Sequence, residues 1–391
     1  GNENLKASVA QVASARATLA ASRTAVFPTL SAGLAGTRSG NLQTGTSNGS
    51  PNNSLSLSAN ASWEIDLWGR LAQASSSAQA SLQASSNDLA AATLSAQALL
   101  AQAYFSLRAA EAQQALYARS VVAYQRSQEL TQVRYEAGVA ARSHVLQAQT
   151  QLKSAQAQAL ELVAQRAQLE HAMAVLLGQP PSTFSIARNE QLPLPPAVPE
   201  LLPARLLERR PDIAAAKARV TAAYAQIGVA DAAFFPELTL SASAGYRNST
   251  LANLVSAPHL FWSLGPSLAA SIFDGGQRKL ASAQARNNAD VATSTYRQAV
   301  LTALQEVEDN LVLADQLQQE AQLQAEASES AQRALEITLD QYRAGTVGYL
   351  SVAAAQSAAL NSEISLLSVR NRQLAAVNQL LKNIAGRWGA A

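Results

Sequence analysis

The chain has 391 residues, of which 48% are hydrophobic but only 5% aromatic and 14% charged. The formal net charge of +2, without any dense cluster of lysine and arginine, gives no reason to expect nucleic acid as a partner. The sequence contains no cysteine, which excludes disulfides, thiol nucleophiles and zinc–thiolate sites within it. So few bulky side chains suit long helices with narrow apolar stripes better than a thick globular core.

The beginning of the chain, over Asn2–Val26, predicts a helix. No signal peptide is visible at Gly1. We therefore expect that an N-terminal portion precedes this sequence. No run of about 18 apolar residues occurs, so no membrane-spanning helix is expected.

Four segments alternate between apolar and small polar residues, which is typical of strands that face two different environments. They are Thr29–Thr37, Ser54–Glu64, Glu237–Tyr246 and Trp262–Ile272, and they form two predicted hairpins, over 27–66 and 235–273. Each is about 10 residues long, the length that a tilted strand needs to cross a bilayer. The alternative is one face of a soluble β-sandwich.

Aromatic residues gather at the ends of these strands, as they do at membrane interfaces. One end has Phe27, Trp63, Trp68, Phe234, Phe235 and Phe273, and the other has Tyr246, Phe261 and Trp262. This distribution favours strands in lipid over strands in a soluble sheet.

Two long stretches contain neither glycine nor proline, and each predicts one uninterrupted helix. The stretches lie between Gly69 and Gly138 and between Gly276 and Gly345, and the predicted helices cover 69–137 and 277–344, which corresponds to about 100 Å of helix each. Shorter helices are predicted over 139–177 and 349–385. A leucine every seven residues predicts coiled-coil packing in the last of these, at Leu360, Leu367, Leu374 and Leu381.

The chain contains two similar halves. Residues 26–28, 65–69, 134–138 and 148–149 have counterparts at 234–236, 272–276, 341–345 and 355–356, at an offset of about 207 residues. We therefore predict a first structural repeat over 1–177 and a second over 212–391. The proline-rich segment 178–211 would connect them.

Four strands cannot close a barrel, and an open sheet edge cannot lie in lipid. Two chains would supply eight strands and leave little lumen, whereas three would supply twelve and leave a passage. We therefore predict a homotrimer in which one shared barrel continues into one shared helical tube. The loops over 39–53 and 247–258 would then lie outside the cell.

Several motifs resemble signatures of the outer-membrane efflux protein family. They are 62–70 (Ser-Trp-Glu-Ile-Asp-Leu-Trp-Gly-Arg), 209–213 (Arg-Arg-Pro-Asp-Ile), 225–230 (Ala-Gln-Ile-Gly-Val-Ala) and two Tyr-x-x-Gly corners, at Tyr135 and Tyr342. The resemblance covers essentially the whole chain and is to the TolC-like, OprM/NodT-type branch of lipoproteins. Members of that branch usually begin with a lipid-bearing cysteine, so any N-terminal lipid anchor would lie outside this sequence.

The resemblance implies a mainly α fold with β: a trimeric twelve-stranded β-barrel in outer-membrane lipid, a periplasmic α-helical barrel and a mixed equatorial belt. It also implies a periplasmic adaptor (membrane fusion) protein and an inner-membrane resistance–nodulation–division (RND) pump as partners. The location would be the outer membrane of a Gram-negative bacterium.

The resemblance places the aperture of the tube at the helix-to-helix corners. Leu350 matches an apolar ring position there, and three such leucines could close a pore by dewetting; a simple packing role is the alternative. Ala354 and His144 stand where relatives often have acidic residues, so a charged ring is not expected. The predicted aperture residues are Leu350, Tyr349, Ala354, Arg142 and His144, and the predicted adaptor-docking residues are Arg134, Tyr135, Gly138, Tyr342, Arg343 and Gly345.

We therefore expect a passive exit duct of a tripartite RND-type multidrug efflux system, which conducts small amphiphilic compounds. A duct for type I protein secretion or for metal-ion export has the same architecture, and a soluble coiled-coil scaffold is the alternative of another class. Catalysis, a cofactor and a metal site are not expected, because His144, His171 and His259 are scattered and lack metal-ligand spacing.

Overall fold

The computed structural model describes residues 1–40, 51–196, 198 and 209–385. Residues 41–50 of the predicted external loop 39–53, and 197 and 199–208 of the predicted connecting segment, lie outside the described residues. The chain divides into two compact units. A sheet unit comprises Val9–Asn87 and Ala214–Gln298, and a helical unit comprises Gly1–Ser8, Asp88–Ile213 and Ala299–Ala391.

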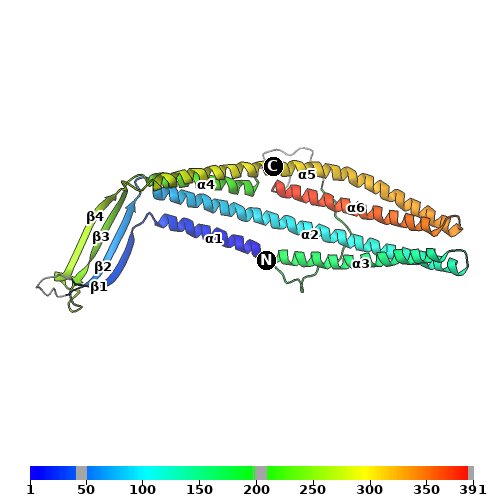
Figure 1. Cartoon of the computed structure of the whole chain (residues 1–391), viewed down its shortest axis with the longest axis horizontal. Helices are drawn as coiled ribbons and strands as arrows, with labels where there is room; N and C mark the ends of the chain where they lie inside the picture. Colours follow the sequence, from blue (N-terminus) through cyan, green and yellow to red (C-terminus); the bar gives the residue numbers. More distant parts are fainter. Residues whose placement is uncertain (41–50, 197, 199–208, 386–391) are drawn as a thin grey trace. The chain divides into compact units, whose positions relative to one another are not determined.

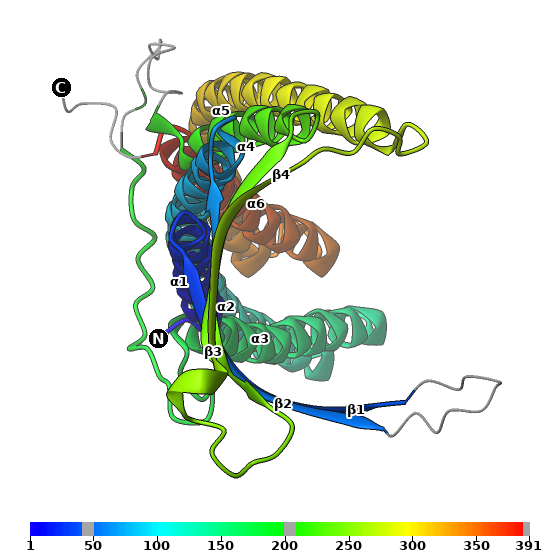
Figure 2. The same cartoon turned by 90° about the vertical axis from the view of Figure 1, so that its left-hand side faces the viewer.

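The sheet unit contains four antiparallel strands in the order β1-β2-β3-β4 (Figure 1). They are β1 (Thr29–Ser39), β2 (Asn52–Ile65), β3 (Glu237–Asn248) and β4 (Leu260–Ala269). A short 3₁₀ turn, η2 (Ala257–His259), precedes β4. Viewed from the side of the strands, the sheet is curved rather than flat (Figure 2).

The register of the strands separates two kinds of side chain. Leu57 lies opposite Leu34 on one side and Tyr246 on the other, and Trp63 lies opposite Leu240. The intervening positions pair small polar residues, such as Asn60 with Ser31 and Ser243. Since residues in register point to the same face, the sheet has one apolar face and one small polar face.

The fourth strand is shorter than the alternation predicts. It ends at Ala269 rather than Ile272, and Ile272 is 98% exposed. The physical reason lies in the partner strand, where Glu237 is the last residue in register with β4. The residue before it is Pro236, which has no N–H to continue the ladder.

Six α-helices occur among the described residues. Four of them are the long and short helices predicted from the sequence: α2 (Arg70–Glu136), α3 (Arg142–Leu177), α5 (Gln277–Ala344) and α6 (Tyr349–Asn383). The others are α1 (Glu3–Thr24) and α4 (Pro211–Ala232). Glycines with positive φ adjoin the ends of the long helices, at Gly69, Gly138, Gly276 and Gly345, because this left-handed conformation is costly for other residues.

Within the helical unit, a buried ion network joins residues 186–189 to α2 and α3. The Glu111 carboxylate accepts hydrogen bonds from Arg108 at 2.6 Å, Arg166 at 2.8 Å and the Asn189 N–H at 3.1 Å. Arg166 also donates to the Ile186 carbonyl at 2.8 Å. Burial raises the pKa of Glu111. The hydrogen bonds from these donors lower it by more, so that its pKa lies below the ordinary value.

The Arg-Arg-Pro-Asp-Ile motif forms a second ionic junction. Arg210 is buried and donates to Asp212 and to Glu306 of α5, both at 2.8 Å. Asp212 also accepts a hydrogen bond from the Ile213 N–H at 2.9 Å. The motif therefore ties the start of α4 to α5 within the helical unit.

Candidate functional site: the apolar sheet face and the helical corners

The apolar face of the sheet is open in the single chain. Leu30, Trp262 and Leu264 are 80%, 75% and 65% exposed. Continuous apolar surface of this kind is unusual on a protein that is surrounded by water. No helix among the described residues has the length and apolarity that a membrane span requires.

The predicted interface aromatics occupy both ends of this face. Trp63 donates its indole N–H to the Val26 carbonyl at 2.8 Å, and Trp68 donates to the Pro236 carbonyl at 2.7 Å. Trp68 also stacks on Phe235 with ring centroids 4.7 Å apart. Exposed rings with a satisfied polar group are typical of a boundary between apolar and aqueous surroundings.

The remaining aromatics divide between the two faces. Phe27 and Phe273 are exposed beside the strands, where the chain enters or leaves them. Tyr246 and Trp262 lie on the apolar face, in register with Leu57 and Ala244. Phe261 was predicted at the same strand end as Trp262, and it lies there on the small polar face, because adjacent residues of a strand point to opposite faces.

The two outer strands of the sheet are β1 and β4. Each therefore presents one edge of backbone N–H and C=O groups that no strand of the described chain pairs. Such an edge is costly in an apolar environment. In surroundings that exclude water, both edges would therefore need a cover.

The helical unit brings its two corners together. The guanidinium of Arg134, near the first corner, lies 4.5 Å from the ring centroid of Tyr342 and donates to the Arg343 carbonyl at 3.4 Å. The Tyr342 hydroxyl lies 3.0 Å from the Thr131 hydroxyl. Three of the predicted docking residues, Arg134, Tyr342 and Arg343, therefore form this contact. A fourth, Tyr135, is next to Arg134 in the sequence and is 40% exposed.

Tyr349 begins α6 and is fully buried. Its ring packs edge-on against Tyr342 at 6.1 Å, and its hydroxyl donates to Gln151 of α3 at 3.1 Å. Burial raises the pKa of Tyr349 to about 12. Tyr349, one of the predicted aperture residues, is therefore part of the hydrophobic core of the corner, together with Ala148 and Val352.

The other predicted aperture residues lie near the surface of the corner. Leu350 is 65% exposed, and Ala354, one turn further along α6, is also exposed. Residues four apart share a face of a helix, so Leu350 and Ala354 lie together, away from buried Tyr349. Arg142 is exposed and His144 half-buried on α3, and neither belongs to the contact around Tyr342.

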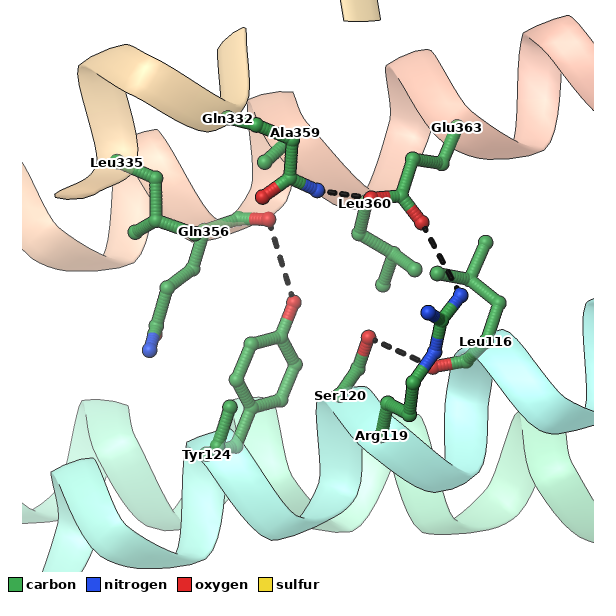
Figure 3. A pocket seen from close by; sticks show the side chains of 11 residues that line it. Leu116, Arg119, Ser120, Tyr124, Gln332, Leu335, Gln356, Ala359, Leu360 and Glu363 are labelled. Carbon is green, nitrogen blue, oxygen red and sulfur yellow. Dashed lines mark hydrogen bonds and ion pairs between the residues drawn. The ribbon is translucent and has the colours of Figure 1, made fainter. Parts of the chain in front are cut away.

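A small polar cavity of about 220 Å³ lies further along the helical unit, between α2, α5 and α6 (Figure 3). Tyr124 donates to the Gln356 carbonyl at 3.4 Å, and Glu363 accepts from Gln332 and lies 3.7 Å from Arg119. The groups bond one another across the helices and include no nucleophile with an adjacent base. The described residues contain no group of three or more side chains suited to a metal ion.

Sequence reasoning missed the Glu111 network and the role of Tyr349. The partners of Glu111 come from α2, α3 and the segment 186–189, and no spacing in the sequence connects them. For Tyr349, the recurrence of Val352, Gln356 and Ala359 at helical intervals gives a buried stripe, which could have identified the packed face.

Comparisons with known proteins agree with this architecture. The family model described as outer membrane efflux protein matches residues 1–179 and 202–386. The chain is 32% identical to the pyoverdine export outer membrane protein OpmQ of Pseudomonas aeruginosa, over 99% of the chain and 83% of OpmQ. It is 29% identical to the toluene efflux pump outer membrane protein TtgI of Pseudomonas putida, over 100% of the chain and 84% of TtgI.

Solved structures show the same fold. The outer-membrane channel OprN superposes with a TM-score of 0.93 at 28% identity, over 99% of this chain and 88% of that one. CusC superposes with a TM-score of 0.91 at 26% identity, over 99% of this chain and 90% of that one. The mainly helical fold with a small sheet is that of these channels, and the chain belongs to the outer membrane efflux protein family.

Proposed function

We propose that the chain is one protomer of a homotrimeric exit duct, through which an RND-type efflux system passes small amphiphilic compounds across the outer membrane. The observation that carries this proposal is the sheet with one exposed apolar face and two uncovered edges. Lipid would cover the face, and neighbouring copies would cover the edges.

The strand directions support closure by rotation. The sheet is antiparallel throughout and has an even number of strands, so β1 and β4 run in opposite directions. The β4 edge of one copy can therefore pair antiparallel with the β1 edge of the next, and repetition of this contact gives a ring. Three copies supply twelve strands, which leave a passage, whereas eight leave room for side chains only.

The helices would form the periplasmic part of the duct. We propose that the two structural repeats, over 1–177 and 212–391, each contribute one long and one stacked helical row to a shared α-barrel, with 178–211 as the equatorial connection. The long helices α2, with 67 residues, and α5, with 68 residues, support this proposal because they have matched lengths.

The corners are the proposed aperture and docking surface. Leu350 would face its copies on the threefold axis and narrow the passage. A periplasmic adaptor would contact the surface around Arg134, Tyr135, Gly138, Arg343 and Gly345, and the inner-membrane pump would deliver the cargo. In this proposal the chain contributes a conduit and no chemical step.

The test uses the full-length protein purified in detergent and reconstituted in planar bilayers. Light scattering should give three copies per particle, and Leu350→Ala should raise single-channel conductance above that of the parent. Leu160→Ala is the matched control, because Leu160 is also exposed on a helix of the same unit. Stable monomers in plain buffer would contradict the duct, and equal conductance of both variants would remove Leu350 from the aperture.

A further inference from the structure

An arginine and a phenylalanine meet on the small polar face of the sheet. The guanidinium of Arg247 lies 5.0 Å from the ring centroid of Phe261. Phe261 is in register with Gly245, and Arg247 with Ser56, so the two are diagonal neighbours on one face. Both lie at the outer end of the sheet, defined here as the end formed by Ser39, Asn52, Asn248 and Leu260.

This pair differs in size and charge from the residues next to it on the same face. Away from this pair, β2 and β3 place small uncharged side chains there until the opposite end of the sheet, where Glu64 and Glu237 lie on the same face. The small residues of β2 and β3 are Ser58, Asn60, Ser62, Thr239, Ser241, Ser243 and Gly245. Phe261 is the single large apolar side chain on this face of the described strands, and sheet packing does not explain it, because its neighbours are Gly245 and serine residues.

The charge of Arg247 has no acidic counterpart at the outer end. No aspartate or glutamate occurs in the sequence over 39–63 or over 238–273. A guanidinium remains protonated at any physiological pH. The other arginine at this end is Arg38, which is in register with Asn53 and therefore lies on the apolar face.

The geometry leaves the pair open to a ligand. Phe261 covers one flat face of the guanidinium, while Arg247 itself remains exposed. A side chain at position 245 is excluded, because its Cβ would lie 2.1 Å from the Leu57 carbonyl oxygen. Guanidinium N–H groups bind a carboxylate in two parallel hydrogen bonds, and an aromatic ring or guanidinium plane stacks on planar groups.

We propose that Arg247 and Phe261 form a recognition site for planar, carboxylate-bearing solutes at the outer end of the duct. The proposal rests on the proposed function, in which the small polar face lines the lumen. Three copies of the pair would surround the exit and attract anions electrostatically. The binding must be weak, because a site in a conducting path has to release what it attracts.

The first experiment measures ion selectivity of the full-length trimer in planar bilayers under a KCl gradient. Leu350→Ala is used as the background, so that the corner contributes less resistance. We expect Arg247→Gln to lower the chloride-to-potassium permeability ratio by about twofold or more. Arg38→Gln removes the same charge from the same end on the opposite face, and should leave the ratio unchanged.

The second experiment uses benzoate as the probe and acetate as its non-aromatic control. Benzoate should reduce the single-channel current of the background protein more than acetate does at equal concentration. Phe261→Leu should abolish this difference while the permeability ratio stays near that of the background. The permeability ratio therefore reports on the charge of Arg247, and the difference between benzoate and acetate reports on the ring of Phe261.

Equal shifts in Arg247→Gln and Arg38→Gln, or no shift in either, would overturn the inference. So would equal block by benzoate and acetate. If the purified protein forms no conducting trimer, the proposed function itself fails, and the site with it. A conducting trimer without these differences leaves the duct intact and removes only the recognition site.

Discussion

In the sheet, Leu30 and Trp262 are 80% and 75% exposed, whereas at the helical corners Tyr349 and Val352 are fully buried. The corners complete their packing within one chain, through hydrogen bonds such as Tyr349–Gln151. The sheet leaves both its apolar face and its edges unfinished. This difference indicates that the corners pack by contacts within the chain, whereas in the proposed function the sheet depends on lipid and on other copies.

The largest effect should come from a charge on the apolar face. Ala59 lies in mid-strand between Ala32 and Ala244. Ala59→Arg should destabilise the inserted barrel by about 2–4 kcal/mol per chain, since lipid-facing arginine is costly near the bilayer centre. Because three chains share the proposed barrel, the loss to the whole assembly is about three times as large. Folding of the denatured protein into lipid vesicles, followed in urea, measures the loss.

The matched control for that substitution is Asn60→Arg. It places the same side chain one residue away, on the small polar face opposite Ser31 and Ser243. Its effect should be much smaller, because this face would contact water. Equal losses in the two variants would contradict the assignment of the faces.

The next effect concerns the helical unit alone. Glu111→Gln leaves the buried guanidinium of Arg108 and the partly buried one of Arg166 without their shared carboxylate, which should cost about 3–5 kcal/mol. Thermal unfolding followed by circular dichroism measures this in detergent. Glu329→Gln is the control, because its partner Arg333 is exposed and such surface pairs contribute about 1 kcal/mol or less.

The same carboxylate predicts an acid dependence. The pKa of Glu111 in the folded protein lies below its ordinary value of 4.5. Its contribution is therefore complete above pH 4.5 and is lost as the pH falls through the folded pKa. Glu111→Gln should flatten the fall in stability below that pH, and an unchanged acid profile would speak against the network.

A smaller effect should appear at alkaline pH. The pKa of Tyr349 is raised from its ordinary value of 10.0 to about 12. The stability that its neutral form contributes is present below pH 10 and is lost as the pH rises towards 12. Tyr349→Phe should reduce the difference in melting temperature between pH 9 and pH 11.5, and a variant as alkali-sensitive as the parent would contradict the burial.

The smallest effect should follow Tyr342→Phe. It removes the hydroxyl that lies 3.0 Å from Thr131 but keeps the ring beneath Arg134. One hydrogen bond contributes about 1 kcal/mol. The control is Tyr135→Phe, because Tyr135 is 40% exposed and should change the free energy of unfolding by less than about 0.5 kcal/mol.

Local rules predicted much of the fold. Glycines that interrupt helices locate α2 and α5 to within one residue, because Gly69, Gly138 and Gly345 adopt positive φ. Alternation of apolar and small polar residues locates the strands, since each face of a sheet has one environment. The register then places the apolar residues of all four strands together.

Contacts between distant segments could not be predicted in this way. The end of β4 depends on Pro236 across the sheet, and the burial of Glu111 depends on residues 186–189. The alternation of the strand also predicts that Phe261 and Trp262 point to opposite faces, but grouping the aromatics by strand end did not use this information. The trimer and the aperture remain predictions, because they depend on contacts between several copies of the chain. The repeat also remains a prediction, because it depends on a comparison of the two halves of the chain.

The most direct test of the account is an image of the full-length protein in lipid nanodiscs by electron cryomicroscopy. We predict a threefold particle in which twelve strands form one closed barrel, with Leu30 and Trp262 towards lipid and Arg247 towards the lumen. A particle without threefold symmetry, or one in which the four strands of each chain fold against protein in water, would contradict it.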